Sequence, residues 1–242
     1  MNLFAKPEFP KIFVCFVLMS FHILTVSSQV YMQTETKRVN KGKVISTKSE
    51  IYLELGNGQM TVHYFQPDEF YVFTNLYGEM TVYFPKTNEV MKQQNMFYSS
   101  ENEIMYQFFS NNANDLGLTA SGFVLQDTKY EEQYLVTNWK SAVSRSSKLV
   151  KAQLVQEDYL PIYIAFFDEN DKLVQKIYFA NWQNTQAAFY PTKITQIDYI
   201  AENDSIVSRK TYDGILTGPT AKNKFAKITI PENAKLITTK KQ

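Results

Sequence analysis

The sequence of 242 residues predicts a mainly β, α+β fold in which consecutive antiparallel strands form a single sheet. Phe, Tyr and Trp make up 15% of the chain, glycine contributes only 8 residues, and short runs alternate between apolar and polar side chains. Aromatic residues fit a pleated surface, and alternation interrupted by turn residues is typical of hairpins. The same composition excludes a disordered chain, a collagen-like repeat and a multi-pass membrane protein.

The first 28 residues are predicted to be a signal peptide that is cleaved. Two lysines precede an almost unbroken apolar run from Ile12 to Val26. This run of about fifteen residues is shorter than the roughly 20 that span a bilayer, so a secretory leader is favoured over a permanent anchor. We therefore expect an exported protein, soluble after cleavage, with residues 29–242 as a single domain. The only cysteine, Cys15, lies in the leader, so the mature chain contains no disulfide.

Strands are expected from Val44 onward, separated by polar or glycine-containing turns. The Gly56-Asn57-Gly58 segment contains Asn-Gly, which favours a tight hairpin turn because both residues adopt positive φ angles. The expected strands are Ile51–Leu55, Met60–Tyr64, Glu69–Asn75, Glu79–Phe84, Phe123–Thr128, Glu132–Trp139, Leu149–Glu157, Leu160–Phe167, Leu173–Asn181, Lys193–Ala201 and Ile206–Asp213. After them, the segment 214–242 contains one more short apolar alternation.

One helix is predicted between the two groups of strands. Ser100 and Glu103 have the spacing of a capping box, and the helix should end at Asn111-Asn112, followed by a polar loop up to Gly122. One face of this helix is apolar, with Ile104, Met105, Phe108 and Phe109.

Several expected strands are apolar on both faces. In Glu69–Asn75, Phe70 and Val72 lie on one side, and Tyr71 and Phe73 lie on the other. A sheet with one solvated face should alternate more cleanly. Either the helix, the C-terminal segment or long loops cover the second face, or the sheet is curved around a cavity for an apolar ligand.

The residues that perform common catalytic chemistry are scarce. Without the leader, His63 is the sole histidine and no cysteine remains, which excludes the usual Ser-His-Asp, Cys-His and multi-histidine metal arrangements. An acid/base pair among Glu131, Glu132, Glu157 and Asp158 is the remaining enzymatic alternative, although their spacing is that of ordinary surface charge. We expect no enzymatic activity, cofactor or metal. The net charge of +1 predicts no nucleic-acid partner.

Four segments stand out by their order along the chain. They are the Pro-x-x-Phe segment Gln66-Pro67-Asp68-Glu69-Phe70, the aromatic strand Gly78–Pro85, Asn88-Glu89-Val90, and the closing pattern Phe225–Leu236. Together they resemble the outer-membrane lipoprotein carriers of the LolA family, in the LolA/LolB superfamily. The helix expected at Ser100 falls where that family places a helix under its lid. The order and spacing of the segments carry the resemblance, which spans most of the mature chain.

This resemblance implies an unclosed, strongly curved antiparallel half-barrel, capped by short helices, that shields acyl chains in the periplasm. Shielding is physically required because each methylene buried from water is worth about 0.8 kcal/mol. The implied partners are lipoproteins or other acylated cargo, an inner-membrane release complex and an outer-membrane acceptor, and the carrier is expected to be a monomer. Two alternatives stay open: a half-barrel for another hydrophobic cargo, such as a glycolipid or pigment ester, and an envelope sensor or scaffold without lipid transfer.

The resemblance also selects candidate residues for the acyl cavity. Phe70 matches the family position at the mouth that receives the lipoprotein. Gln66 stands where the family usually has an arginine that holds the lid, so it is the candidate lid contact, although an amide cannot supply a charged fork. The expected lining comprises Ile51, Leu53, Leu55, Met60, Val62, Phe70, Val72, Met80, Val82, Ile104, Met105, Phe108, Phe109, Ile162, Ile164 and Phe166.

Overall fold

The computed structural model describes residues 29–110, 113–142, 149–185, 188–201 and 204–238. The predicted leader and the predicted helix end at Asn111-Asn112 lie outside the described residues. None of the helices within the described ranges is long and apolar enough to cross a membrane.

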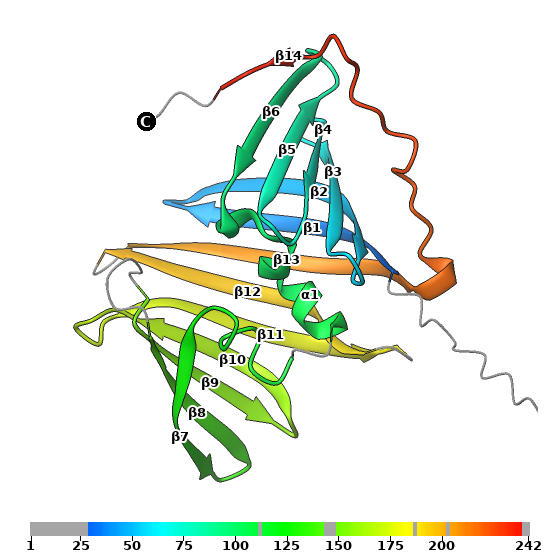
Figure 1. Ribbon diagram of the computed structural model, residues 1–242. Coiled ribbons are helices and arrows are strands. Elements are labelled where there is room, and N and C mark those ends of the chain that lie inside the picture. Colours follow the sequence, from blue (N-terminus) through cyan, green and yellow to red (C-terminus); the bar gives the residue numbers. More distant parts are fainter. Residues whose placement is uncertain (1–28, 111–112, 143–148, 186–187, 202–203, 239–242) are drawn as a thin grey trace, which may run out of the picture.

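Strands dominate the structure (Figure 1). They are β1 (Gln29–Asn40), β2 (Lys43–Glu54), β3 (Gln59–Gln66), β4 (Phe70–Thr74), β5 (Glu79–Phe84), β6 (Glu89–Gln94), β7 (Phe123–Glu131), β8 (Tyr134–Ser141), β9 (Lys151–Glu157), β10 (Leu160–Phe167), β11 (Leu173–Asn184), β12 (Phe189–Ala201), β13 (Asp204–Thr217) and β14 (Lys235–Leu236). The helical segments are the 3-10 turns η1 (Met96–Tyr98), η2 (Ser100–Asn102) and η3 (Gly218–Thr220) and the short α-helix α1 (Ile104–Phe109).

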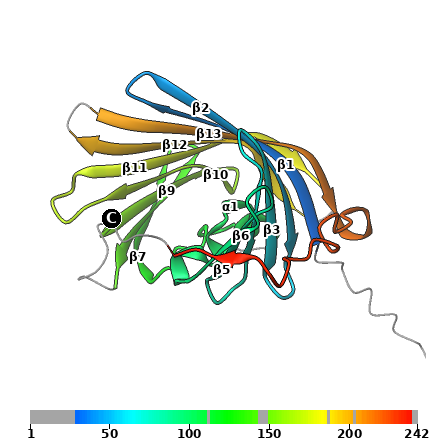
Figure 2. The same ribbon diagram turned by 90° about the horizontal axis from the view of Figure 1, so that it is seen from above.

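The strands described form one sheet in the order β14-β6-β5-β4-β3-β2-β1-β13-β12-β11-β10-β9-β8-β7. Two antiparallel meanders, β1–β6 and β7–β13, meet where β1 pairs with β13, for example at Thr34 opposite Tyr212. Among the strands within the described residues, only β14 is parallel to its neighbour, β6. The sheet curves around α1 without closing, as Figure 2 shows from above. The predicted fold class, an unclosed half-barrel with short helices, is confirmed.

All the predicted strands are present, but β1, β6 and the two-residue β14 were not expected. The first half of β1 has three consecutive apolar residues, Val30, Tyr31 and Met32, and its second half is polar and basic. In β6, Val90 and Met91 are adjacent in an otherwise polar strand. In β1 the apolar residues are buried on both faces of the sheet, and β6 lies close to the sheet edge. Neither strand therefore alternates between apolar and polar residues.

The predicted start of the helix at Ser100 is wrong. Ser100 belongs to η2, is fully buried, and its Oγ donates a hydrogen bond of 2.6 Å to the Gly58 carbonyl. The α-helix begins at Ile104, and Glu103 precedes it without a side-chain capping bond. The side chain of Ser100 therefore connects this segment to the β2–β3 turn, and that of Glu103 bonds to Lys210 and Tyr212 of β13.

The core fills the concave side of the sheet. The side chains of Met105, Phe108 and Phe109 from α1 are 0–7% exposed and belong to one apolar cluster with the inner face of the strands. Phe108 packs edge-on against Phe179 and Trp182, with ring centroids 5.8 and 5.5 Å apart. A six-residue helix is therefore almost wholly held by tertiary contacts.

The convex side of β1–β6 is covered by the segment after β13. Phe225 is 6% exposed and meets the rings of His63 and Tyr71 edge-on, at 5.9 and 6.3 Å. Lys224 lies 4.2 Å from the ring centroid of Tyr31. Beyond these contacts, the segment reaches the sheet edge as β14 (Figure 1). The C-terminal segment thus accounts for the second apolar face of β4.

Candidate functional site

Most of the predicted cavity residues come together on the concave face. One cluster contains Ile51, Leu53, Leu55, Met60, Val62, Val72, Ile104, Met105, Phe108, Phe109, Ile164 and Phe166. Phe70, Met80, Val82 and Ile162 lie outside this cluster, Ile162 at an irregularity in the pairing of β10 with β9. The residues on β2, β3 and α1 are largely packed against one another, so much of the predicted lining forms the core in this conformation.

An apolar strip continues along the inner face of β3–β6, beyond α1. We define the inner strip as Tyr64, Phe70, Phe84, Met80 and Met91, all half-buried. Tyr64 stacks on Phe70 with centroids 4.5 Å apart, and Phe70 lies 5.7 Å from Phe84. Phe70 shares its face with Val72, because side chains two residues apart on a strand point the same way. The strip is therefore the accessible continuation of the concave core.

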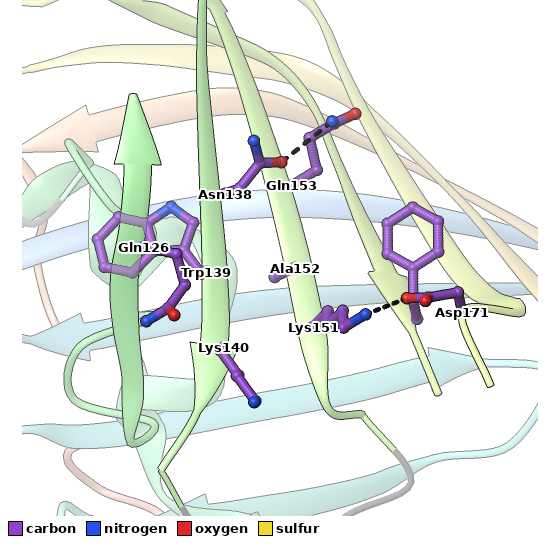
Figure 3. Close-up of a pocket in the computed structure, with 9 residues that line it drawn as sticks. Gln126, Asn138, Trp139, Lys140, Lys151, Ala152, Gln153 and Asp171 are labelled. Carbon is purple, nitrogen blue, oxygen red and sulfur yellow. Dashed lines mark hydrogen bonds and ion pairs between the residues drawn. The ribbon is translucent and has the colours of Figure 1, made fainter. Parts of the chain in front are cut away.

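Among the pockets formed by described residues, we consider three open ones. The first, of about 380 Å³, spans β7–β10 and has a mixed lining, in which Trp139, Ala152 and Phe167 are the apolar members (Figure 3). Its polar side chains are partly paired, Lys151 with Asp171, and Gln153 donating to Asn138 at 3.2 Å. Two further pockets, of about 470 and 310 Å³, adjoin the ends of β3–β6. Of the predicted lining, these pockets include only Met80 and Met60.

A polar contact fixes the start of α1 to the sheet. The Nζ of Lys210 on β13 donates to both carboxylate oxygens of Glu103, at 2.9 and 3.0 Å, and the hydroxyl of Tyr212 donates at 3.1 Å. The Lys210 ammonium also lies 5.1 Å from the Tyr212 ring centroid. We call these three residues the Glu103 latch. No sequence pattern predicted it, since Lys210 and Tyr212 lie 107 and 109 residues after Glu103.

Burial of the latch tyrosine changes its ionisation. Tyr212 is 1% exposed, and desolvation, followed by the nearby Glu103 carboxylate, raises its pKa well above the ordinary value. Desolvation and the same carboxylate also raise the pKa of Tyr64. Both hydroxyls therefore stay protonated at neutral pH, and Tyr212 can act only as a donor to Glu103.

Buried tyrosines predict a loss of stability at alkaline pH. Desolvation and the hydrogen bond to Glu54 raise the pKa of Tyr52 to about 12, and that of Tyr212 is raised as well. Tyrosines of an unfolded chain titrate near pH 10, so above that value the unfolded state binds fewer protons than the folded state. The free energy of unfolding, measured by urea titration, should therefore fall as pH rises from about 10 toward the folded pKa values.

The Tyr212→Phe variant supplies the control for this pH profile. The variant lacks one hydroxyl whose protonation differs between the folded and unfolded states. The free energy of unfolding should therefore decline less steeply with pH. An unchanged slope in the variant would show that Tyr212 does not contribute, and a flat profile in the parent chain would contradict the prediction altogether.

The remaining predicted residues lie away from the concave core. Gln66 is exposed at the end of β3, opposite Lys48 of β2. His63 stacks on Tyr71 at 4.4 Å on the convex face, with ring nitrogens 3.8 Å from Glu50 and 3.4 Å from Glu69.

The carboxylates weighed as an acid/base pair lie at the β7–β8 and β9–β10 connections, where Glu131 and Glu157 end their strands. Glu131, Glu132 and Asp158 are exposed, and Glu157 is half-buried. Within the described residues, no three His, Cys, Asp or Glu side chains are grouped so that they could hold a metal ion.

Neither a protein-family model nor a curated protein matches this sequence. Solved structures do match its fold. A LolA superfamily protein from Nitrosomonas europaea is 11% identical with a TM-score of 0.54, covering 79% of this chain and 86% of that one. A putative outer membrane lipoprotein-sorting protein domain from Vibrio parahaemolyticus is 13% identical with a TM-score of 0.55, covering 81% and 88%. A DUF1329 family protein from Desulfovibrio piger is 12% identical with a TM-score of 0.58, covering 83% and 90%. With its open, curved sheet around a short helix, the chain has a LolA-like fold.

Proposed function

We propose that this protein is a periplasmic carrier that shields the acyl chains of lipoproteins and delivers them toward the outer membrane. The observation that carries the proposal is the inner strip, an apolar surface continuous with the concave core but only half-buried. An acyl chain of about sixteen carbons laid along such a surface gains on the order of 10 kcal/mol from burial. No covalent step is needed for this function.

Movement of α1 would enlarge the binding surface. An isolated helix of this length is unstable in water, so α1 persists through its packing and through the Glu103 latch. Displacing it would open the inner face of β2 and β3, and acyl chains would then replace the contacts of Met105, Phe108 and Phe109. The methionines on this surface adapt to chains of different shape.

The proposal includes export and partners. Residues 29–242 would act in the periplasm as a monomer, receiving lipoproteins from an inner-membrane release complex and passing them to an outer-membrane acceptor. Support comes from the LolA-like fold and from the Vibrio parahaemolyticus structure, whose description is lipoprotein sorting.

A charge placed in the inner strip should abolish binding of acyl chains. We expect Phe70→Glu to weaken the binding of a fluorescent palmitate analogue at least tenfold, because a carboxylate buried beneath the ligand costs several kcal/mol. Phe70→Leu should retain most of the affinity. Tyr130→Glu is the matched control, since Tyr130 is 75% exposed at the distant β7–β8 hairpin. Equal affinity of Phe70→Glu and Tyr130→Glu would exclude the inner strip as the site.

Native mass spectrometry of the protein purified without detergent separates the remaining alternatives. A copurifying acylated peptide or lipoprotein supports the proposed cargo. The mass of a glycolipid or pigment ester would identify the other carrier function. A ligand-free protein that also fails to bind the palmitate analogue would favour the sensor or scaffold.

A further inference from the structure

The tip of the β1–β2 hairpin concentrates positive charge that the chain as a whole lacks. We define the basic hairpin as residues 37–48, which contain Lys37, Arg38, Lys41, Lys43 and Lys48 and no Asp or Glu. The net charge of the whole chain is only +1. Residues 37–45 are all exposed. Figure 2 shows the hairpin extending outward beside β13 and β12.

Neighbouring acids neutralise only part of this charge. Lys37 lies 3.3 Å from Glu35, and Lys41 lies 3.5 Å from Asp204. Both contacts are surface ion pairs, which are weak and screened by salt. Within the described residues, Arg38 and Lys43 form no ion pair. The hairpin therefore presents a positive surface to solvent.

Aliphatic side chains are exposed among these cations. Val39, Val44 and Ile45 are 38%, 64% and 58% exposed. Val39 pairs with Val44, and Ile45 points to the opposite face of the hairpin, so both faces of the tip are apolar. The adjoining end of β12 adds Tyr199 and Ile200, which are 36% and 57% exposed. Isolated exposed aliphatic residues are common, but here several occur together within a cationic segment.

We propose that the basic hairpin docks on an anionic membrane surface. Lysine and arginine side chains would contact the anionic headgroups, while Val39, Val44 and Ile45 enter the boundary with the acyl chains. A membrane interface offers both environments at once, and each basic residue near an anionic surface adds to the attraction. A nucleic-acid backbone would use the charges but leave the aliphatic tip in water. The proposal concerns the tip of the β1–β2 hairpin and stands whether or not the concave face binds acyl chains.

Vesicle flotation tests this proposal directly. The full chain, expressed with its own leader, should float with vesicles of phosphatidylcholine and phosphatidylglycerol at 3:1 and not with pure phosphatidylcholine, and binding should weaken as salt is raised. We expect Lys41→Glu/Lys43→Glu to lower the partition coefficient at least tenfold. Val44→Ser/Ile45→Ser should lower it severalfold with no change in net charge.

The matched control is Lys172→Glu/Lys227→Glu, which changes the net charge equally at exposed positions elsewhere. It should bind vesicles like the parent chain, and thermal unfolding should be similar for all variants. The proposal is overturned by failure to bind anionic vesicles, equal binding to neutral vesicles, an equal loss in the control, or full retention in the serine variant. Equally tight binding to a short DNA duplex at the same salt would instead identify a general polyanion site.

Discussion

Replacing Gly78 with alanine should destabilise the protein by about 3–4 kcal/mol. Gly78 has a φ of +68°, and an added Cβ would lie 2.1 Å from the Asn95 carbonyl oxygen and 2.9 Å from the Met96 Cα. The left-handed conformation costs an L-residue about 1–2 kcal/mol, and overpacking adds about 1–3 kcal/mol. Because the obstacles are backbone atoms, no side-chain rotation relieves them. Urea denaturation measures the loss as a lower midpoint at unchanged slope.

Gly42 provides a matched control for this substitution. Its φ is +76°, but nothing lies within 4 Å of the position of an added Cβ. Gly42→Ala should therefore lower the free energy of unfolding only by the cost of the left-handed conformation, about 1–2 kcal/mol. The difference between the two variants isolates the clash with Asn95. Equal losses would show that the close approach at Gly78 relaxes without cost.

The loss at Gly78 should extend to the helix that follows. The Asn95 amide donates to the Gly78 carbonyl at 3.0 Å, and the Ser100 amide donates to the Asn75 carbonyl at 3.1 Å. These bonds connect the β4–β5 turn to the segment that leads into α1. A displaced Asn95 would shift η1 and η2, so Gly78→Ala should also loosen the packing of α1 on the concave face.

The strands were predictable where one face of the sheet is apolar and the other is polar. In β3, apolar residues at every second position identified both the strand and its inner face. In β1, Val30 and Met32 face the core and Tyr31 lies on the other face, so burial on both sides removed the alternation. Periodicity reports a difference between faces, and a strand without that difference gives no signal.

The apolar part of the candidate site was predictable for the same reason, whereas its polar part was not. The alternation in β2 and β3 placed Ile51, Leu53 and Val62 on one face, where the structure brings them together with α1. Glu103 and Lys210 are distant in sequence, and each is an ordinary charged residue until the sheet curves. The lid contact at Gln66 came from the resemblance alone and stays a prediction; Gln66 is exposed at the end of β3. The charged contact of α1 is the Glu103 latch.

Substitution of Lys210 by methionine should release α1. The change keeps the aliphatic stem but removes the two charge-assisted bonds to Glu103, which are worth about 2 kcal/mol for a partly buried carboxylate. Local opening of α1 should then become about thirtyfold more frequent, which hydrogen exchange at the amides of Met105–Phe109 would measure. If opening precedes binding, as our proposed function implies, the affinity for the palmitate analogue should rise by a similar factor.

Lys224→Met is the control, because it removes another ammonium that lies over a tyrosine ring, that of Tyr31, but on the convex face. It should leave exchange in α1 and acyl affinity unchanged. Unchanged exchange in Lys210→Met would show that the latch does not hold the helix. Faster exchange without tighter binding would uncouple α1 from the ligand and restrict binding to the inner strip, where Phe70→Glu still tests it. Faster exchange and tighter binding together would identify the Glu103 latch as the contact that sets the resting state of the concave face.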